Sequence, residues 1–372
     1  MVKIRKKMLY ISLINSIKDP GVFKKILGQC SAFRDRGFEV DYTYCDGSFI
    51  YKNSEIIASY KINSFSNLLL RFIFPDIFTK IMNEYDYDLI YIRKSYISIS
   101  FFSFLSRVKK KNGNIKILLE IPTFPYVKEL RGFLRSCLYY YEVLSAKLIR
   151  SKVDLITFYG DWSGPIWNCR TIRLDNAIDI HSIPMIRRPL ISDNIFNLIF
   201  VGNIEPRHGL ERIIDGVCKC KHDGFDNYII HIIGDGEELN NLKIKVSKAG
   251  VSDKFIFHGM LDDNDLNRVF DLSDVAIGAL GMYKLKINNS SNIKNREYAA
   301  RGLPMIIGHD DSGISDASFV LKFPNDPSPI NINKIIEWVH KNNFDSSDIR
   351  NYALRNLTWR RQINKILRAI DV

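Results

Sequence analysis

The chain has 372 residues and a formal net charge of +12, from 53 Lys and Arg against 41 Asp and Glu. Hydrophobic residues make up 46% and charged residues 25%, which excludes a disordered or fibrous chain and, at this length, predicts two globular domains. The positive charge predicts an anionic partner, which is a phosphorylated substrate, a nucleic acid or a membrane surface.

Cysteine content and hydropathy limit the class of protein further. Six scattered cysteines do not make a disulfide scaffold, so we expect reduced thiols in a cytoplasmic protein. Cys218, Cys220 and His222 lack a second ligand pair at zinc spacing, and we expect no metal site. The apolar run 8–14 follows a basic N-terminus but has no cleavage site, so it is read as a buried strand. No stretch reaches the ~18 apolar residues of a membrane span.

Short apolar runs alternate with helical patterns through the first half of the chain, which indicates a parallel sheet. The predicted strands cover 9–13, 38–44, 88–92, 115–120 and 153–158, and the predicted helices cover 24–36 and 133–150.

The same alternation begins again after a crossover segment at 171–194. Its predicted strands cover 197–202, 228–234, 255–257, 274–280 and 304–307, and its predicted helices cover 210–220, 237–249, 263–271 and 292–301. We therefore predict an α/β fold of two Rossmann-like domains facing across a cleft, with the ligand beside the carboxyl ends of strands. The expected domains are 1–180 and 181–350, followed by a helix at 351–372 that returns toward the first domain.

Two glycine-containing turns follow strands of the second half. In the turn 201–209, Gly202 permits backbone N–H groups to face an anion, and Arg207 and His208 add charge or hydrogen bonds. An ordinary surface turn would contain the same residues. In Gly234-Asp235-Gly236 the glycines permit a tight turn and Asp235 can cap the next helix, so a structural role is as good an explanation as ligand contact.

A third motif begins the predicted helix 292–301. Lys294 and Glu297 are three residues apart and share one helix face. Lys294 can reach a phosphate, and Glu297 can accept two hydrogen bonds from a ribose diol. A surface ion pair, with a contribution of only about 0.3 kcal/mol, would show the same spacing.

In order and spacing, these three motifs together resemble the donor domain of GT-B glycosyltransferases, close to glycosyltransferase family 4. Two N-terminal segments, 21–29 and 120–129, resemble parts of bacterial polysaccharide glycosyltransferases of this group. The resemblance runs from about Leu9 to Trp359.

The resemblance implies transfer of a hexose-type sugar from a UDP or GDP sugar to a glycan or lipid-linked saccharide. It also implies retention of configuration, no metal and no cofactor, and a place in capsule or lipopolysaccharide biosynthesis. The N-terminal domain would bind the acceptor and the C-terminal domain the nucleotide sugar. Glu297 matches the ribose-binding Glu, His208 with Arg207 matches the diphosphate loop, Lys294 matches the Lys of a K-x-x-E motif, and Gly21 matches a glycine turn near the donor phosphate and acceptor.

Two positions depart from the family pattern. Asn289 stands where the family has a Glu that contacts the sugar, and Asn203 replaces an Arg on the phosphate. Arg207, Lys284, Lys286 or Lys294 would compensate for the lost charge. The candidate donor-binding residues are therefore Gly21, Gly202, Asn203, Arg207, His208, Gly234, Asp235, Gly236, Asn289, Lys294 and Glu297.

Catalytic residues are less defined by the pattern. Retaining enzymes of this fold lack a clear side-chain nucleophile, and we name none. Inversion would need a general base, for which Glu120 and Glu129 beside the proline-rich loop are the candidates.

The segment 133–152 combines aromatic, aliphatic and basic residues. With 67–78 and 107–111 it predicts that the N-terminal domain docks on the inner face of the cell membrane, against anionic lipid. For the segment 133–152 alone, a core helix with cations on its exposed face is a slightly better explanation.

Two other functions are weighed against the transferase. A GT-B sugar-nucleotide epimerase would favour carboxylates in the cleft and no membrane-facing surface. A nucleic-acid-binding protein would need a recognisable binding module; none is found, so we expect no nucleic acid partner. A dinucleotide dehydrogenase is disfavoured because G-x-G-x-x-G does not follow the first strand.

Overall fold

The computed structural model describes residues 5–59, 78–94, 97–125, 133–187, 195–220 and 227–372. The chain divides into two compact units. Unit 1 comprises Met1–Leu174 and Trp359–Val372, and unit 2 comprises Asp175–Thr358. The chain thus passes from one unit to the other after Leu174 and again after Thr358. The boundaries predicted from the sequence were at 180 and 350.

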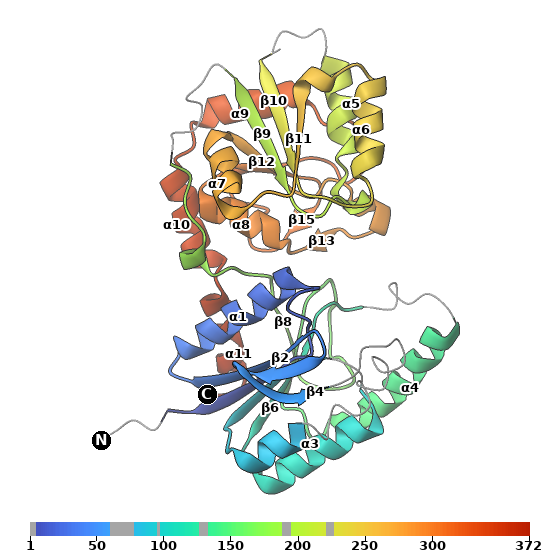
Figure 1. Cartoon of the computed structure of the whole chain (residues 1–372), viewed down its shortest axis with the longest axis vertical. Helices are drawn as coiled ribbons and strands as arrows, with labels where there is room; N and C mark the ends of the chain where they lie inside the picture. Colours follow the sequence, from blue (N-terminus) through green and yellow to red (C-terminus); the bar gives the residue numbers. More distant parts are fainter. Residues whose placement is uncertain (1–4, 60–77, 95–96, 126–132, 188–194, 221–226) are drawn as a thin grey trace. The chain divides into compact units, whose positions relative to one another are not determined.

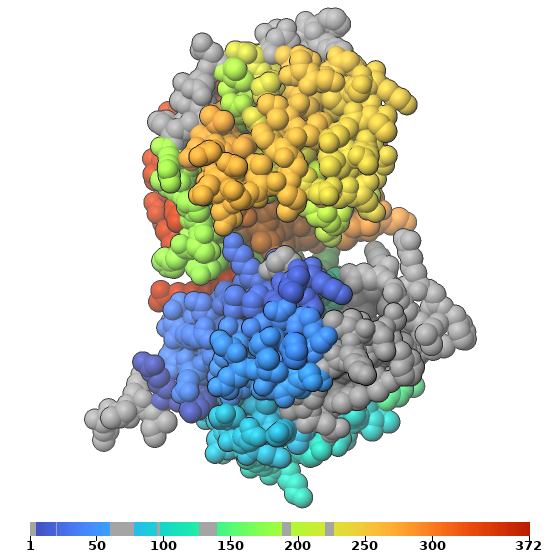
Figure 2. Space-filling model, viewed as in Figure 1, coloured from blue at the N-terminus to red at the C-terminus, as the bar shows by residue number. Residues whose placement is uncertain are grey.

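Unit 1 is built on an eight-stranded sheet of order β4-β3-β2-β1-β5-β6-β7-β8. The strands from β2 through β1 to β8 are parallel, and β3 and β4 form an antiparallel extension whose outer strand is largely exposed (Figure 2). The strands are β1 Lys7–Ile11, β2 Glu39–Asp46, β3 Phe49–Lys52, β4 Glu55–Ser59, β5 Leu89–Arg93, β6 Lys116–Ile121, β7 Leu155–Phe158 and β8 Thr171–Arg173.

Both faces of this sheet are covered by helices (Figure 1). Alternate residues of β1 point to opposite faces, so Leu9 and Ile11 join the core under α3 and α4, and Tyr10 contacts the α1 side through Gln29. These helices are α1 Pro20–Arg34, α3 Ile99–Lys111 and α4 Phe133–Ile149, and α11 Trp359–Ala369 packs on α1.

Unit 2 contains a six-stranded parallel sheet of order β11-β10-β9-β12-β14-β16. A separate two-stranded ladder joins β13 Asn289–Ser290 to β15 Asp310–Asp311. The six strands are β9 Phe196–Val201, β10 Tyr228–Ile233, β11 Phe255–Gly259, β12 Val275–Ile277, β14 Met305–Ile307 and β16 Val320–Lys322.

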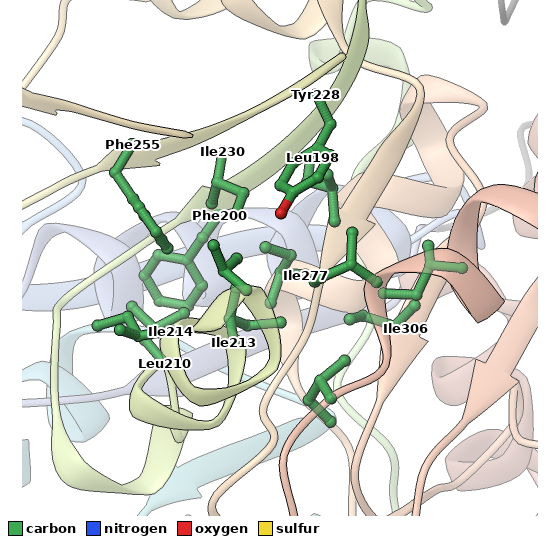
Figure 3. Close-up of a cluster of buried hydrophobic side chains, with 14 of the residues drawn as sticks. Leu198, Phe200, Leu210, Ile213, Ile214, Tyr228, Ile230, Phe255, Ile277 and Ile306 are labelled. Atoms are coloured by element: carbon green, nitrogen blue, oxygen red, sulfur yellow. The ribbon is translucent and has the colours of Figure 1, made fainter. Parts of the chain in front are cut away.

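Each face of this sheet carries its own apolar core. On one face, Leu198, Phe200 and Ile230 pack against Ile213 and Ile214 of α5 (Figure 3). On the other face, Ile199 and Met305 pack with Tyr298 of α8. The helices of the unit are α5 Glu211–Cys220, α6 Leu239–Lys248, α7 Asp263–Leu272, α8 Ile293–Arg301, α9 Ile332–Asn342 and α10 Ser346–Asn356.

The predicted α/β class with parallel sheets is confirmed. The stretch 332–372 is three helices, α9, α10 and α11, of which only α11 belongs to unit 1. Within the residues described, no helix is both long and apolar enough to cross a membrane.

The two units differ in charge. Unit 1 contains 32 Lys and Arg against 16 Asp and Glu, a net charge of +16, and unit 2 contains 21 against 25, a net charge of −4. The positive charge of the chain therefore comes from unit 1.

Replacing Gly28 with Ala is expected to destabilise the protein. A Cβ at Gly28 would lie 2.6 Å from Cδ1 of the buried Trp359 ring, so α1 and α11 would have to separate. We expect a loss of about 1–3 kcal/mol in the free energy of unfolding, measured by chemical denaturation.

Gly21→Ala, in the same helix, is the matched control because a Cβ there meets nothing within 4 Å. It should leave stability unchanged or raise it by up to about 1 kcal/mol through helix propensity. Equal effects of the two substitutions would contradict the packing argument.

Candidate functional site

The first two glycine turns lie side by side at the carboxyl ends of β9 and β10 in the unit 2 sheet. Val201 at the end of β9 pairs with Ile233 at the end of β10, so Gly202 and Gly234 follow at the same level. The Gly202 N–H donates to the Ile233 carbonyl at 3.0 Å. Gly234 has φ 123°, and a Cβ there would collide with the Gly202 carbonyl. The two turns are thus packed backbone against backbone, which requires glycine.

Asp235 does not cap α6, contrary to the prediction. Its carboxylate accepts from the Gly236 N–H at 2.7 Å, and its carbonyl accepts from the Ile204 N–H at 2.7 Å. The N-cap position of α6 is Glu238, which makes no side-chain cap. Asp235 therefore joins the two turns. Gly236 packs as closely, since a Cβ there would collide with the Ile204 carbonyl.

Glu205 organises the polar side chains of the 203–209 loop. Its carboxylate accepts from Asn203 Nδ2 at 2.5 Å and pairs with Arg207 Nε at 2.7 Å. The guanidinium of Arg207 stays half-exposed. Asn203 and Arg207, both predicted to lie near the donor phosphates, are therefore held together by one carboxylate.

His208 is buried and serves as a neutral hydrogen-bonding group. Its Nδ1 accepts from the Glu205 N–H at 3.3 Å, which leaves the ring proton on Nε2. Burial lowers the pKa of His208 to about 2, and the cations of Lys294 and Arg207 contribute in the same direction. His208 thus supplies an N–H donor and no charge at neutral pH.

Lys294 in the first turn of α8 carries a buried amine. Its Nζ has no exposed surface and no hydrogen-bond partner among the residues described. It lies 3.9 Å from the centroid of the Phe200 ring, and a Cβ at Gly202 would be 3.1 Å from it. Burial lowers the pKa of Lys294 well below its ordinary value, and Arg207 lowers it further against a smaller opposite effect of Glu205. A buried donor without a partner is costly, so this arrangement is suited to an anion.

Glu297 does not pair with Lys294, so the simple surface ion pair weighed from the sequence is not formed. Its Oε1 instead accepts from Arg301, Nη2 at 2.9 Å and Nε at 3.1 Å. Arg301 is held in turn by Asn267 and by the face of the Phe270 ring. Both printed contacts fall on Oε1 of a carboxylate that is 29% exposed, which leaves Oε2 for a ligand.

The start of α8 is fixed by a buried ion pair that the sequence analysis missed. Asp311 pairs with Arg296, and both side chains are fully buried. The same carboxylate accepts from Asn295 Nδ2 at 2.6 Å and from the Asn292 N–H at 3.2 Å. These residues occupy unassigned positions of the motif, and Asp311 is too distant in sequence for a spacing argument to find it.

The remaining candidates have separate surroundings. Asn289 Oδ1 accepts from Ser312 Oγ at 2.8 Å, beside the β13–β15 ladder. Lys284 pairs with Glu211 at 2.6 Å, and Lys286 is exposed. Gly21 lies in the first turn of α1, in unit 1, with open space around its Cα. In Figure 1 α8 and the β13–β15 ladder lie at the end of unit 2 toward which β9 and β10 run.

Glu120 lies at the end of β6 in unit 1 and is fully buried. Its carboxylate pairs with Arg93 and accepts from Gln29 Nε2 at 2.7 Å and Tyr91 OH at 2.9 Å. Burial alone would raise the pKa of Glu120, but the cations of Lys25 and Arg93 outweigh this effect and hold it below its ordinary value. This geometry favours a structural role; a catalytic role stays a prediction. Glu129 lies outside the described residues.

The segments predicted to face a membrane are described only in part. Residues 67–77 lie outside the described ranges, as do the side chains of 133–139. In the remainder of α4, Tyr140, Leu144 and Leu148 recur at helical spacing and are 68%, 64% and 46% exposed. The described part of α4 thus presents an apolar stripe to solvent. In the described part of the chain, no group of three or more His, Cys, Asp or Glu is arranged to hold a metal ion.

Comparisons with known proteins agree on the class of protein. Residues 185–353 match the family model described as Glycosyl transferases group 1. An uncharacterized glycosyltransferase of Methanocaldococcus jannaschii is 23% identical over 340 residues, which cover 85% of this chain and 81% of that protein.

Two solved structures show the similarity of fold. The sucrose-phosphate synthase of Thermosynechococcus elongatus has a TM-score of 0.66 at 14% identity and covers 98% of both chains. Anabaena HepE, solved in complex with UDP-glucose, has a TM-score of 0.59 at 14% identity and covers 98% of this chain and 99% of its own. The expected pair of Rossmann-like domains is confirmed.

Replacing Glu120 with Gln is expected to destabilise the chain strongly. The substitution leaves the buried cation of Arg93 without its partner, and we expect a loss of about 3–5 kcal/mol in the free energy of unfolding at pH 7. Because the pKa of Glu120 is depressed in the folded state, its contribution is present above its ordinary pKa and is lost as the pH falls below it.

Glu39→Gln is the control, because among the described residues the Glu39 carboxylate forms just an exposed pair with Lys7. It should change stability by less than about 0.5 kcal/mol. The measurement is urea denaturation from pH 7 to pH 4; a wild-type–like stability of the Glu120 variant would refute the structural role.

Proposed function

We propose that this chain, which is a glycosyltransferase with the GT-B fold, transfers a hexose-type sugar from a UDP or GDP sugar to a glycan or lipid-linked saccharide. The transfer is proposed to retain the anomeric configuration, to need no metal, and to serve surface polysaccharide synthesis such as that of capsule or lipopolysaccharide. Membership of family 4 stays part of this proposal.

The observation that carries the donor assignment is the buried amine of Lys294. It has no partner among the described residues, and it lies against Gly202 and the Phe200 ring, beside the loop that holds His208 and Arg207. Lys294 therefore offers an amine, His208 a neutral ring N–H and Arg207 a guanidinium near Gly202. A diphosphate is the part of a nucleotide sugar that satisfies such a set.

The reaction needs this chemistry at the leaving group. In glycosyl transfer the bond between the anomeric carbon and the diphosphate oxygen breaks and its electron pair stays on that oxygen. The acceptor hydroxyl oxygen forms the new bond to the anomeric carbon, and the hydroxyl proton is released to solvent. Negative charge grows on the departing diphosphate, and donors already in place stabilise it. The amine of Lys294 and the start of α8 are suited to this task.

Glu297 is proposed to bind the ribose of the donor. It lies three residues after Lys294 on α8, and its Oε2 is not used by Arg301. A carboxylate so placed can accept hydrogen bonds from vicinal hydroxyls while Lys294 contacts the phosphates.

Relatives and neighbours support the substrate class. Solved neighbours include a lipopolysaccharide outer core galactosyltransferase and an O-GlcNAc transferase in complex with UDP and GlcNAc. The apolar stripe on α4 and the charge of +16 on unit 1 support a peripheral contact with anionic lipid on the inner face of the cell membrane. A lipid-linked acceptor would be reached in that position.

Lys294→Met is expected to weaken UDP or GDP binding by roughly 10- to 100-fold, because a hydrogen bond to a charged group contributes about 1.5–3 kcal/mol. In the wild type, a bound diphosphate raises the lowered pKa of Lys294, so binding takes up protons at pH values between the free and bound pKa. Affinity should therefore fall as the pH rises through that window. Calorimetry in buffers of different ionisation enthalpy measures both effects.

Lys248→Met is the control, since Lys248 is exposed on α6 of the same unit. It should keep both the affinity and the proton uptake of the wild type. Nucleotide binding that is the same in the Lys294 and Lys248 variants would exclude the proposed phosphate site.

Glu297→Gln separates the ribose role from the phosphate role. Loss of the carboxylate should weaken UDP or GDP binding about tenfold and leave inorganic pyrophosphate binding unchanged, whereas Lys294→Met should weaken both. Competition titrations with the two ligands measure the difference. A parallel loss of pyrophosphate binding in the Glu297 variant would contradict the ribose assignment.

A further inference from the structure

A cavity of about 600 Å³ lies in unit 1, at the amino end of β1. Arg5 and Lys6 line it from the residues before β1, Arg36 from the turn after α1, and Arg368 from the last turn of α11. We call these four side chains the basic cluster. Segments from both ends of the described chain thus place four cations around one hollow.

Among the described residues that line this hollow, none has a carboxylate side chain. The other lining residues include Phe38 and Leu367, which are buried and apolar. Four like charges around one cavity repel one another, and the net charge of +16 on unit 1 adds to the local positive potential. An anion in the cavity would relieve this repulsion.

A purely structural explanation is that cations stabilise the carboxyl ends of α1 and α11. The cations at the end of α3, also in unit 1, are by contrast held by partners outside that helix. There Lys109 bonds the Ile115 carbonyl and Asp154, and Lys111 bonds the Met82 carbonyl. Among the residues that the structure describes, the side chains of the basic cluster make no hydrogen bond, ion pair or ring contact. They are therefore available to a ligand in a way that the cations of α3 are not.

The cavity is separate from the edge of the sheet where substrates bind in open α/β folds. Ligands lie beside the carboxyl ends of the strands, where Arg93 and Glu120 stand in unit 1. Arg5 and Lys6 precede β1 and so lie at its amino end. The volume of the cavity lies in the range of small-molecule sites, about 300–1,000 Å³.

We propose that this cavity is a second anion site, which binds the phosphate groups of a phosphorylated ligand. Arg36 and Arg368 hold the phosphate oxygens, and Phe38 and Leu367 contact the apolar part of the ligand. The ligand is a phosphorylated small molecule or the headgroup of a phospholipid. Binding there joins the N-terminal strand, α1 and α11, and so stabilises unit 1.

The test compares the full chain with the variant Arg36→Ala/Arg368→Ala. The control is Lys80→Ala/Arg360→Ala, which removes two exposed cations of the same unit outside the cavity, one of them on α11. Inorganic pyrophosphate is titrated at low salt, and all three proteins also carry Lys294→Met, so that the donor site contributes little binding. The proteins that keep Arg36 and Arg368 should bind pyrophosphate, and the Arg36/Arg368 variant should lose at least about tenfold in affinity. Equal binding by all three proteins would overturn the proposal.

Thermal unfolding separates a binding role from a structural one. Without ligand, the Arg36/Arg368 variant should unfold at the wild-type temperature or above it, because repulsion is relieved. With pyrophosphate, and with Lys294→Met in every protein so that the donor site contributes little, only the proteins that keep Arg36 and Arg368 should gain stability. A variant that unfolds earlier and still gains stability from pyrophosphate would show that these arginines only stabilise helix ends, and would refute the site.

A second arm identifies the source of the phosphate. For a lipid headgroup, sedimentation with phosphatidylglycerol vesicles falls in the Arg36/Arg368 variant relative to the control, and pyrophosphate competes with the vesicles. For a small phosphorylated molecule, vesicle sedimentation is the same in both variants while pyrophosphate binding still differs. Either result supports a phosphate site. If the Arg36/Arg368 variant keeps both vesicle sedimentation and pyrophosphate binding, the proposal is contradicted.

Discussion

The placement of the Lys294 amine is the constraint around which the functional side of unit 2 is built. The Lys294 amine lies against Gly202 and Phe200, where Gly202 has no side chain and holds φ 145°, and a Cβ at Gly202 would be 3.1 Å from the amine and displace it. The turn of Gly202 is in turn supported by Gly234, whose own lack of a side chain lets the two backbones meet. Gly202 and Gly234 therefore both help to place the Lys294 amine, although Lys294 is distant from them in sequence.

The other side of that constraint is the start of α8. Asp311 receives hydrogen bonds from three residues at the helix start, Asn292, Asn295 and Arg296. Burying an ion pair of this kind costs desolvation energy, which these added hydrogen bonds offset. What the pair gains for the protein is orientation: it fixes the first turn of α8, and with it the direction of Lys294.

The fold could be predicted from local sequence patterns, whereas the candidate site could be predicted only in part. Alternation of apolar runs and helical periods is a property of neighbouring residues, so the parallel sheets could be predicted. The β3–β4 hairpin was missed because its outer strand, Glu55–Ser59, is only partly buried and its short apolar run Ile56-Ile57-Ala58 shows no alternation. Lys294 and Glu297 could be placed on one helix face, but their separate partners, Gly202 and Arg301, depend on tertiary packing. The network of Glu120 joins segments up to 130 residues apart, beyond the reach of any spacing rule.

The distribution of charge between the two units changes the interpretation of the net charge. The net charge of +12 pointed to an anionic ligand, yet unit 2, which holds the proposed diphosphate site, has a net charge of −4. In the proposed function, attraction for the donor is therefore local, from Lys294 and from the ring N–H of His208. This favours catalysis over simple retention of substrate. A diphosphate linked to sugar carries one negative charge fewer than the nucleoside diphosphate that leaves, so a buried amine interacts more strongly with the departing group than with the intact donor. Binding that increases as the bond breaks is the form of binding that lowers a reaction barrier.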